Sequence, residues 1–243
     1  MAMNPAVRQK IQIVLAVAIG LAAMRTGYVL YQRYSSNKKE TQQKAAAPPL
    51  NPDYYVTPKK LYPYDLKSAR QLTKQPVWVK EGYRYFYYPY SLATHRTNFE
   101  HEAGMLLPIQ KLEIKDVVTD TAPGSSGQKQ VMAVFEQEGQ TYAVQIGTFK
   151  DGDYKIYSDE MLFVQDPREL YKHWPADVWQ SVEQHQVKQG MNELQADFAI
   201  GMGRPEKQDD PAWKTVHYPN GGKPITITYH EGKATEIKSE QTS

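Results

Sequence analysis

Histidine and carboxylate side chains gather in one short stretch, His-Arg-Thr-Asn-Phe-Glu-His-Glu, at residues 95–102. Imidazole nitrogens and carboxylate oxygens could bind a metal ion or exchange protons with a substrate. His95 and His101 are six residues apart, however, and Glu100, His101 and Glu102 would alternate between the two faces of a strand. We therefore expect an exposed polar loop or strand here. A metal-dependent enzyme that uses His95 and His101 stays open as an alternative.

Aromatic side chains crowd a second stretch, Tyr-Arg-Tyr-Phe-Tyr-Tyr-Pro-Tyr, at residues 83–90. On a strand, alternate residues share a face, and one aromatic face could stack on sugars or dock a proline-rich peptide. The alternative is that one face is core and the other packs against a preceding arm. The candidate interaction surface consists of Tyr83, Tyr85, Tyr87, Tyr88 and Tyr90.

Other chemical motifs point to structure and not to catalysis. The glycines at 124–127 and 201–203 are not phosphate-binding loops, because no Lys-Ser or Lys-Thr pair follows them. No Gly-x-Ser-x-Gly motif occurs. The sequence predicts no catalytic, cofactor-binding or metal-ligating residue. A further aromatic set is expected at an interface between helices and a β-rich region: Tyr171, His173, Trp174 and Trp179.

The N-terminal run at residues 11–31 is apolar enough to enter a membrane. As a helix it would be about 31 Å long, which matches a hydrocarbon core of about 30 Å. Arg25 could extend toward the headgroups, where tyrosines also gather. The predicted membrane-anchor residues are Ile11, Leu15, Ile19, Arg25, Tyr28 and Tyr31. A cleaved secretory signal and a buried core helix stay open as alternatives.

Charge is unevenly spread along the 243 residues. The net charge is +2, and residues 1–44 carry seven Lys/Arg against one Glu, so the remainder carries −4. A basic N-terminal flank suits anionic lipid headgroups, and a mildly acidic body argues against nucleic acid as a partner. The chain has no cysteine. Disulfides, a thiolate nucleophile and a lipidated N-terminal cysteine are therefore excluded.

Composition shifts predict five segments: a membrane anchor at 1–34, a linker at 35–51, a β-rich domain at 52–167, connecting helices at 168–186 and a final module at 187–243. The β-rich domain begins with a proline-rich arm whose tyrosines at 54, 55, 62 and 64 are expected to lie against the domain. Asp65 is expected to cap a short helix that reaches Leu72. Residues 104–120 are expected to form one longer strand with a kink at Pro108.

Strand lengths and turn signals in the middle of the chain predict a small barrel or sandwich, including a hairpin at Glu138-Gly139. These lengths and spacings loosely resemble those of bacterial SH3-like barrels. Asp166 is expected to cap a helix with Pro167 at its first position. In the final module, Asn192 is expected to cap a helix that Gly201 and Gly203 end, with Pro205 stopping any continuation. Turns at 220–222 and 231–232 then join three strands. The predicted class is α+β: a transmembrane helix, a barrel or sandwich-like middle, and a helix with a three-stranded antiparallel sheet.

The final module also resembles the SmpA/OmlA family of small BamE-like proteins of outer-membrane assembly. The positions that match the family pattern are Gly190, Met191, Gln195, Gly201, Pro205, Tyr218, Gly232 and Lys233. Gly203 and the missing lipidated cysteine depart from the pattern. The resemblance implies an α+β module that lies outside the cytoplasm and binds other proteins, and it implies no chemistry.

Together these features predict a non-enzymatic bacterial inner-membrane protein with a single span and a periplasmic body. Its expected partners are membrane lipid, through the N-terminal helix, and other envelope proteins. A module that binds cell-wall glycan through the tyrosine-rich strand is a second alternative, beside the metal-dependent enzyme. No cofactor is predicted.

Overall fold

The computed structural model describes residues 20, 23–35, 50–125 and 127–239, and the chain divides into two compact units, Met1–Tyr54 and Tyr55–Ser243. In the first unit, residues 23–35 are helical, with Arg25, Tyr28 and Tyr31 exposed on the helix surface. The predicted anchor residues Ile11, Leu15 and Ile19 lie outside the described residues. Across the described ranges, no helix combines the length and the apolar character needed to cross a membrane.

The second unit begins with an extended segment at residues 55–64, which we call the strap. The 3-10 turn η1 (Pro52–Tyr55) leads into it, and α2 (Leu66–Ala69) and η2 (Arg70–Lys74) follow it. Asp65 caps α2 as predicted: its carboxylate accepts from the Ser68 N–H at 2.6 Å, and the Ser68 hydroxyl completes a capping box.

A curled antiparallel sheet of seven strands dominates the middle of the chain, in the order β3-β2-β8-β7-β6, with β4 also pairing with β2 and β9 with β8. The predicted hairpin joins β7 and β8, and Glu138 and Gly139 both have positive φ, as such tight turns require. Register shifts at Val131/Met132 and Ile114/Asp116 bend the long strands, since bulges increase local twist. The strands are β2 (Phe86–Ser91), β3 (Arg96–Thr97), β4 (Gly104–Met105), β6 (Ile114–Asp120), β7 (Gln128–Gln137), β8 (Gln140–Lys150) and β9 (Asp153–Ile156).

A second sheet has three short strands in the order β10-β1-β5: β10 (Leu162–Phe163), β1 (Val77–Val79) and β5 (Lys111–Leu112). The one-turn helix α3 (Ser158–Met161) precedes β10. The predicted single strand over residues 104–120 is therefore wrong, because the chain divides there into β4, β5 and β6. The break follows Pro108, where Ile109 adopts a positive φ of 55° and no strand can continue.

Three helices follow: α4 (Pro167–Leu170), α5 (Ala176–Glu183) and α6 (Glu193–Ile200). Asp166 caps α4 with Pro167 at the first helical position, and Asn192 caps α6 through a capping box with Gln195. Gly201, with φ of 80°, ends α6. All three of these boundaries agree with the sequence predictions.

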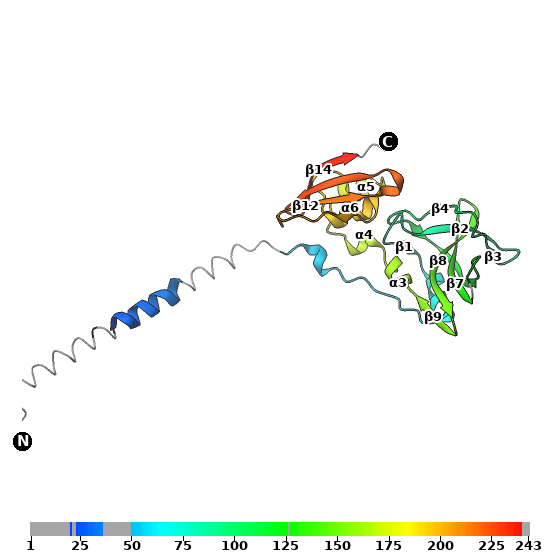
Figure 1. The fold of residues 1–243 in the computed structure, drawn as a ribbon, viewed down its shortest axis with the longest axis horizontal. Coiled ribbons are helices and arrows are strands. Elements are labelled where there is room, and N and C mark those ends of the chain that lie inside the picture. The colour runs from blue at the N-terminus through cyan, green and yellow to red at the C-terminus, as the bar shows by residue number, and fades with distance from the viewer. Residues whose placement is uncertain (1–19, 21–22, 36–49, 126, 240–243) are drawn as a thin grey trace, which may run out of the picture. The chain divides into compact units, whose positions relative to one another are not determined.

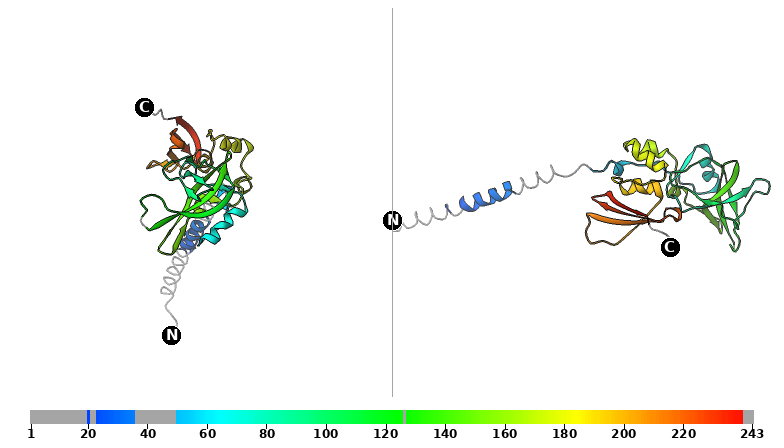
Figure 2. Two further views of the ribbon diagram at one scale, coloured as in Figure 1. Left: turned by 90° about the vertical axis from the view of Figure 1, so that its right-hand side faces the viewer. Right: turned by 90° about the horizontal axis from the view of Figure 1, so that it is seen from above.

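The C-terminal sheet has four strands where three were predicted: β11 (Arg204–Pro205), β12 (Trp213–Tyr218), β13 (Ile225–His230) and β14 (Lys233–Ser239). The extra strand β11 pairs antiparallel with Val216 and His217 of β12. Its proline was read only as a helix stop, but an edge strand tolerates proline because one side of its backbone needs no partner. The predicted turns at 220–222 and 231–232 are confirmed. Figure 1 and the right-hand view in Figure 2 show α5 and α6 on one face of this sheet.

Two main cores stabilise the second unit. One lies in the β-rich middle and includes Val117, Phe135 and Ile146, all fully buried. The other joins α4, α5 and α6 to the C-terminal sheet. The β-rich middle also contributes to this second core, because Phe163 of β10 is one of its buried members and Trp78 of β1 packs against it.

Candidate functional site

The polar stretch at residues 95–102 does not form a site. His95 lies in the turn between β2 and β3 with a positive φ of 52°, and Glu100, His101 and Glu102 are exposed in the next turn. Within the described part of the chain, no three His, Cys, Asp or Glu side chains are placed to hold a metal ion. The geometry gives the metal-dependent alternative no support.

The tyrosines of residues 83–90 do not share one open surface, because each of them is partly or fully buried. Tyr85 and Tyr87 pack against the middle core, and Tyr87 meets Phe135 edge-on at 5.6 Å between ring centroids. On the other face, Tyr90 is 7% exposed, and Tyr88 lies 5.5 Å from the Phe99 ring. The predicted interaction surface of Tyr83, Tyr85, Tyr87, Tyr88 and Tyr90 is thus corrected: the last four mainly pack.

Tyr83 does not share a strand face with the other tyrosines, because it precedes β2 and has a positive φ of 59°. Its N–H donates to the Leu106 carbonyl at 2.7 Å. Its ring lies against Gly221, where an added Cβ would be only 2.7 Å from the ring, and it meets His185 edge-on at 6.5 Å. Tyr83 therefore links the β-rich middle to the C-terminal half.

The strap tyrosines are exposed where the sequence predicted contact with the domain. Tyr54, Tyr55, Tyr62 and Tyr64 were expected to lie against the domain. Tyr55, Tyr62 and Tyr64 are instead 69%, 68% and 78% exposed, and Tyr54, in the first unit, is 79% exposed. The residues between them face inward instead: Val56 packs against the C-terminal core, Leu61 packs against the middle core, and Pro63 is buried.

The helical aromatics pack together in the C-terminal core. Phe198 of α6 lies at 5.2 Å from both Tyr171 and Trp174, and Trp174 lies 5.1 Å from Trp179. Phe163 of β10 meets Phe198 at 5.8 Å, so this cluster does join the helices to the β-rich region. His173 lies at its edge, 6.1 Å from the Tyr171 ring.

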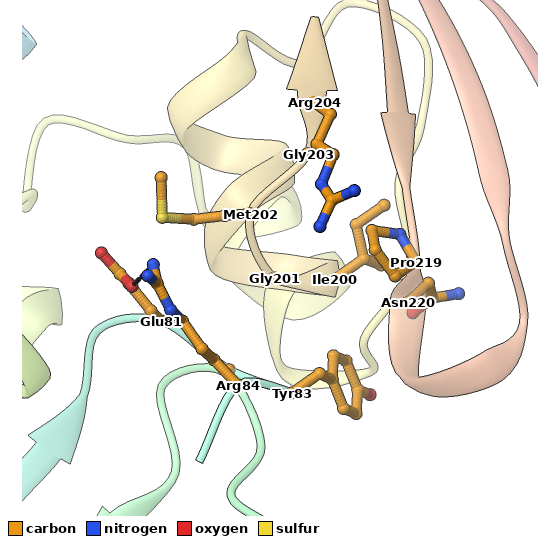
Figure 3. Close-up of a pocket in the computed structure, with 11 residues that line it drawn as sticks. Glu81, Tyr83, Arg84, Ile200, Gly201, Met202, Gly203, Arg204, Pro219 and Asn220 are labelled. Carbon is orange, nitrogen blue, oxygen red and sulfur yellow. Dashed lines mark hydrogen bonds and ion pairs between the residues drawn. The ribbon is translucent and has the colours of Figure 1, made fainter.

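A cleft of about 360 Å³ lies where residues 81–84 meet the loop after α6 and the turn after β12 (Figure 3). Two charged side chains approach it from different segments, Arg84 beside the β-rich middle and Arg204 at the start of β11. Its lining residues are Glu81, Gly82, Tyr83, Arg84, Ile200, Gly201, Met202, Gly203, Arg204, Pro219 and Asn220.

Glycines allow these segments to approach closely. A Cβ at Gly201 would lie 2.8 Å from the Gly82 carbonyl oxygen, and a Cβ at Gly82 would overlap Pro108. A Cβ at Gly203 would lie 2.3 Å from a Val216 methyl carbon. We call the contact between the two halves at Gly82, Gly201 and Gly221 the glycine seam. It sets the position of the cleft.

The two arginines of the cleft differ in their partners. Arg84 forms an ion pair with Glu81, with 2.5 Å between Nη1 and Oε2. Arg204 is exposed, and none of the ion pairs within the described ranges includes it. A guanidinium group with free donors is suited to a carboxylate or phosphate, which it can bind through two parallel hydrogen bonds.

A polar network lies behind the loop that lines the cleft. The Asp197 carboxyl accepts from the Gly203 N–H and from the Tyr218 hydroxyl, and the Tyr218 and Tyr229 hydroxyls are 2.8 Å apart. Burial, followed by the nearby Glu193 charge, raises the pKa of Asp197 to about 7. Burial also raises the pKa of both tyrosines. Asp197 thus ties the cleft loop to the core.

Sequence reasoning missed Arg84, Met202 and Arg204. Gly201 and Gly203 were identified, but only as residues that end a helix. A signal was present in the run Gly-Met-Gly-Arg, since two glycines beside an exposed methionine and an arginine indicate a close backbone approach next to a recognition group.

Comparisons with protein-family models, with curated proteins and with solved structures find no match to this chain. The resemblances to the BamE-like family and to SH3-like barrels therefore stay predictions.

Proposed function

We propose that this protein is a non-enzymatic, membrane-anchored protein of the bacterial cell envelope that binds a partner protein in the cleft at the glycine seam. The partner would present an acidic group to Arg204. The exposed guanidinium of Arg204, at the mouth of a cleft and free of an ion pair among the described residues, is the observation that carries this proposal.

The other lining residues favour a peptide group as ligand over a bare inorganic anion. Met202 is 49% exposed, and Ile200, Tyr83 and Pro219 add apolar surface around the charge. Methionine adapts to different partner shapes, and an apolar wall around one cation suits an acidic residue flanked by apolar side chains. Arg84 would contribute less, because Glu81 already neutralises it.

The proposed cellular location, at the inner membrane with the body in the periplasm, is based on the sequence. The apolar run at 11–31 and the basic flank favour an inner-membrane anchor with the body in the periplasm. A topology reporter fused at the C-terminus tests this directly. Reporter activity restricted to the cytoplasm would contradict the periplasmic location.

Site-specific crosslinking tests the cleft. A photo-crosslinking residue at position 202 of the full chain should give a discrete protein adduct in cells, and the same residue at Leu92, which is 63% exposed on a distant turn, should not. Arg204→Glu should abolish the adduct, because it reverses the charge offered to the acidic group. Lys207→Glu, an exposed charge reversal three residues away, should retain it. An adduct that is unchanged in Arg204→Glu would refute the proposed binding mode.

A further inference from the structure

The exposed residues of the strap include tyrosines and lysines, and its inward-facing residues are apolar. Tyr55, Tyr62 and Tyr64 stand outward with Lys59 and Lys60 between them, and all five are exposed. Inward, Val56, Leu61 and Pro63 hold the segment against the two cores. The exposed side chains of the strap are thus tyrosine rings and ammonium groups.

The backbone of the strap is held against the folded unit before anything binds. The Lys59 N–H donates to the Gln165 side-chain oxygen at 2.8 Å, across 106 residues of sequence. Pro58 and Pro63 restrict the backbone further. A surface that is ordered in advance loses little conformational entropy when it binds.

The charge of the strap contrasts with that of the rest of the folded unit. The strap holds two lysines and no acidic residue, whereas residues 65–243 carry 20 Lys/Arg against 25 Asp/Glu, a net charge of −5. Lys60 has no acidic partner in the ion pairs of the described residues. Burial, followed by the charge of Lys60, lowers the pKa of Lys80. The strap therefore favours an anionic partner.

The shape of the strap narrows the class of partner. Its tyrosine rings are at least 68% exposed and stand out from the surface, so they suit a flat partner. Tyrosine has an apolar ring and a polar tip, and it is enriched at the headgroup level of bilayers. Lysine near an anionic leaflet is attracted by the negative surface potential of the lipids. In the sequence, residues 36–54 separate the strap from the helix that carries Arg25, Tyr28 and Tyr31.

We propose that the outer side of the strap is a second membrane-contacting surface, which lies on the headgroups of an anionic bilayer through Tyr55, Tyr62, Tyr64, Lys59 and Lys60. This contact is separate from the predicted N-terminal anchor and from the cleft. It would hold the folded unit close to the bilayer surface.

Because the chain contains no cysteine, a single introduced cysteine can carry an environment-sensitive fluorophore. The full chain with Tyr64→Cys, labelled at that position, is mixed with vesicles of phosphatidylcholine alone or with added phosphatidylglycerol. We expect an emission rise of at least about twofold with the anionic lipid, which falls when salt is raised to about 0.5 M. A label at Leu92→Cys, on an exposed turn elsewhere, should not respond.

Charge reversals complete the test. Lys59→Glu combined with Lys60→Glu should remove the response at position 64. The matched pair Lys150→Glu and Lys155→Glu, exposed on the β8–β9 hairpin, should retain it. Arg204→Glu should also retain it, so the outcome is independent of the proposed cleft function.

Three results would overturn the proposal. One is no response to anionic vesicles. Another is an equal response to neutral vesicles, which would remove the role of the lysines. The third is the same response to soluble glycerol phosphate without vesicles, which would assign the strap to free phosphate groups and not to a bilayer.

Discussion

Two tyrosine-rich segments of this protein, residues 54–64 and 83–90, have similar composition but differ in the burial of their tyrosines. The second segment supplies most of β2, whose backbone pairs with β3, β4 and β8, and its tyrosines are partly or fully buried. The strap pairs with no strand in the described structure, and its inward positions belong to Val56, Leu61 and Pro63. The residues between the tyrosines therefore decide which tyrosines are buried.

The largest expected effect separates these two segments by stability. Tyr90→Ala removes a ring that is 7% exposed and should lower the free energy of unfolding by about 4 kcal/mol, as for other large-to-small core substitutions. Tyr62→Ala, from a ring that is 68% exposed, serves as the matched control. Urea unfolding followed by circular dichroism measures both. Similar losses of unfolding free energy in the two variants would contradict the difference in packing between Tyr90 and Tyr62.

The second effect concerns Tyr83, which lies in the second segment but precedes β2. Gly221→Ala should destabilise the protein by about 3 kcal/mol, because a Cβ there would meet the Tyr83 ring at 2.7 Å and the φ of 61° is also unfavourable. Gly222→Ala has a positive φ of 94° but nothing within 4 Å, so we expect a loss of about 1 kcal/mol. Comparison of the thermal unfolding of Gly221→Ala and Gly222→Ala isolates the contribution of the contact with the Tyr83 ring. Equal losses would mean that Tyr83 does not fill this position tightly.

The third effect is a pH dependence of stability in the C-terminal half, where Asp197 contacts the buried Tyr218. Asp197 beside Tyr218 has a folded pKa of about 7, above the ordinary 3.8, so the native state binds the extra proton. Stability should therefore be highest below about pH 4 and fall as the pH rises through 7, by about 2 kcal/mol after screening at the partly exposed carboxyl. The difference between wild type and Asp197→Asn, measured by urea unfolding from pH 4 to 8, isolates this slope.

Asp120 provides the control for that slope. Backbone hydrogen bonds from Thr97 and Thr121 outweigh its burial and lower its pKa, so its contribution is present above about 3.8 and is lost only in more acidic solution. The difference between wild type and Asp120→Asn should thus be flat from pH 4 to 8. A slope of the same sign for both carboxyls would contradict the assignment.

The smallest effect is expected at the strap. Tyr62→Ala combined with Tyr64→Ala should change the free energy of unfolding by less than about 0.5 kcal/mol, because both rings are exposed. Leu61→Ala should cost more, since its side chain packs against the middle core. Reversal of this order, again by urea unfolding, would place the tyrosines inward as the sequence first suggested.

Local features of the fold could be read from the sequence. The caps at Asp65, Asp166 and Asn192 and the hairpin at Glu138-Gly139 each depend on a few neighbouring residues, and the structure confirms them. The α+β class with a β-rich middle is also confirmed.

Features that depend on distant contacts could not be predicted. Strand β11 exists because residues 204–205 meet β12 after an intervening loop, and two residues carry no periodic pattern. The cleft is built from segments near 82, 202 and 219, and their approach depends on missing side chains at the glycine seam. Sequence spacing predicts which residues share a strand face, but not whether another layer covers that face.

The placement of Phe163 and Trp78 in the C-terminal core limits how this protein could have been assembled or could be taken apart. A fragment cut near residue 187 would lose aromatic groups that close its own interior, and the remaining piece would expose them to water. Exchange of this half between proteins, by recombination or by engineering, would therefore have to carry β1 and β10 along or replace their rings from a new neighbour.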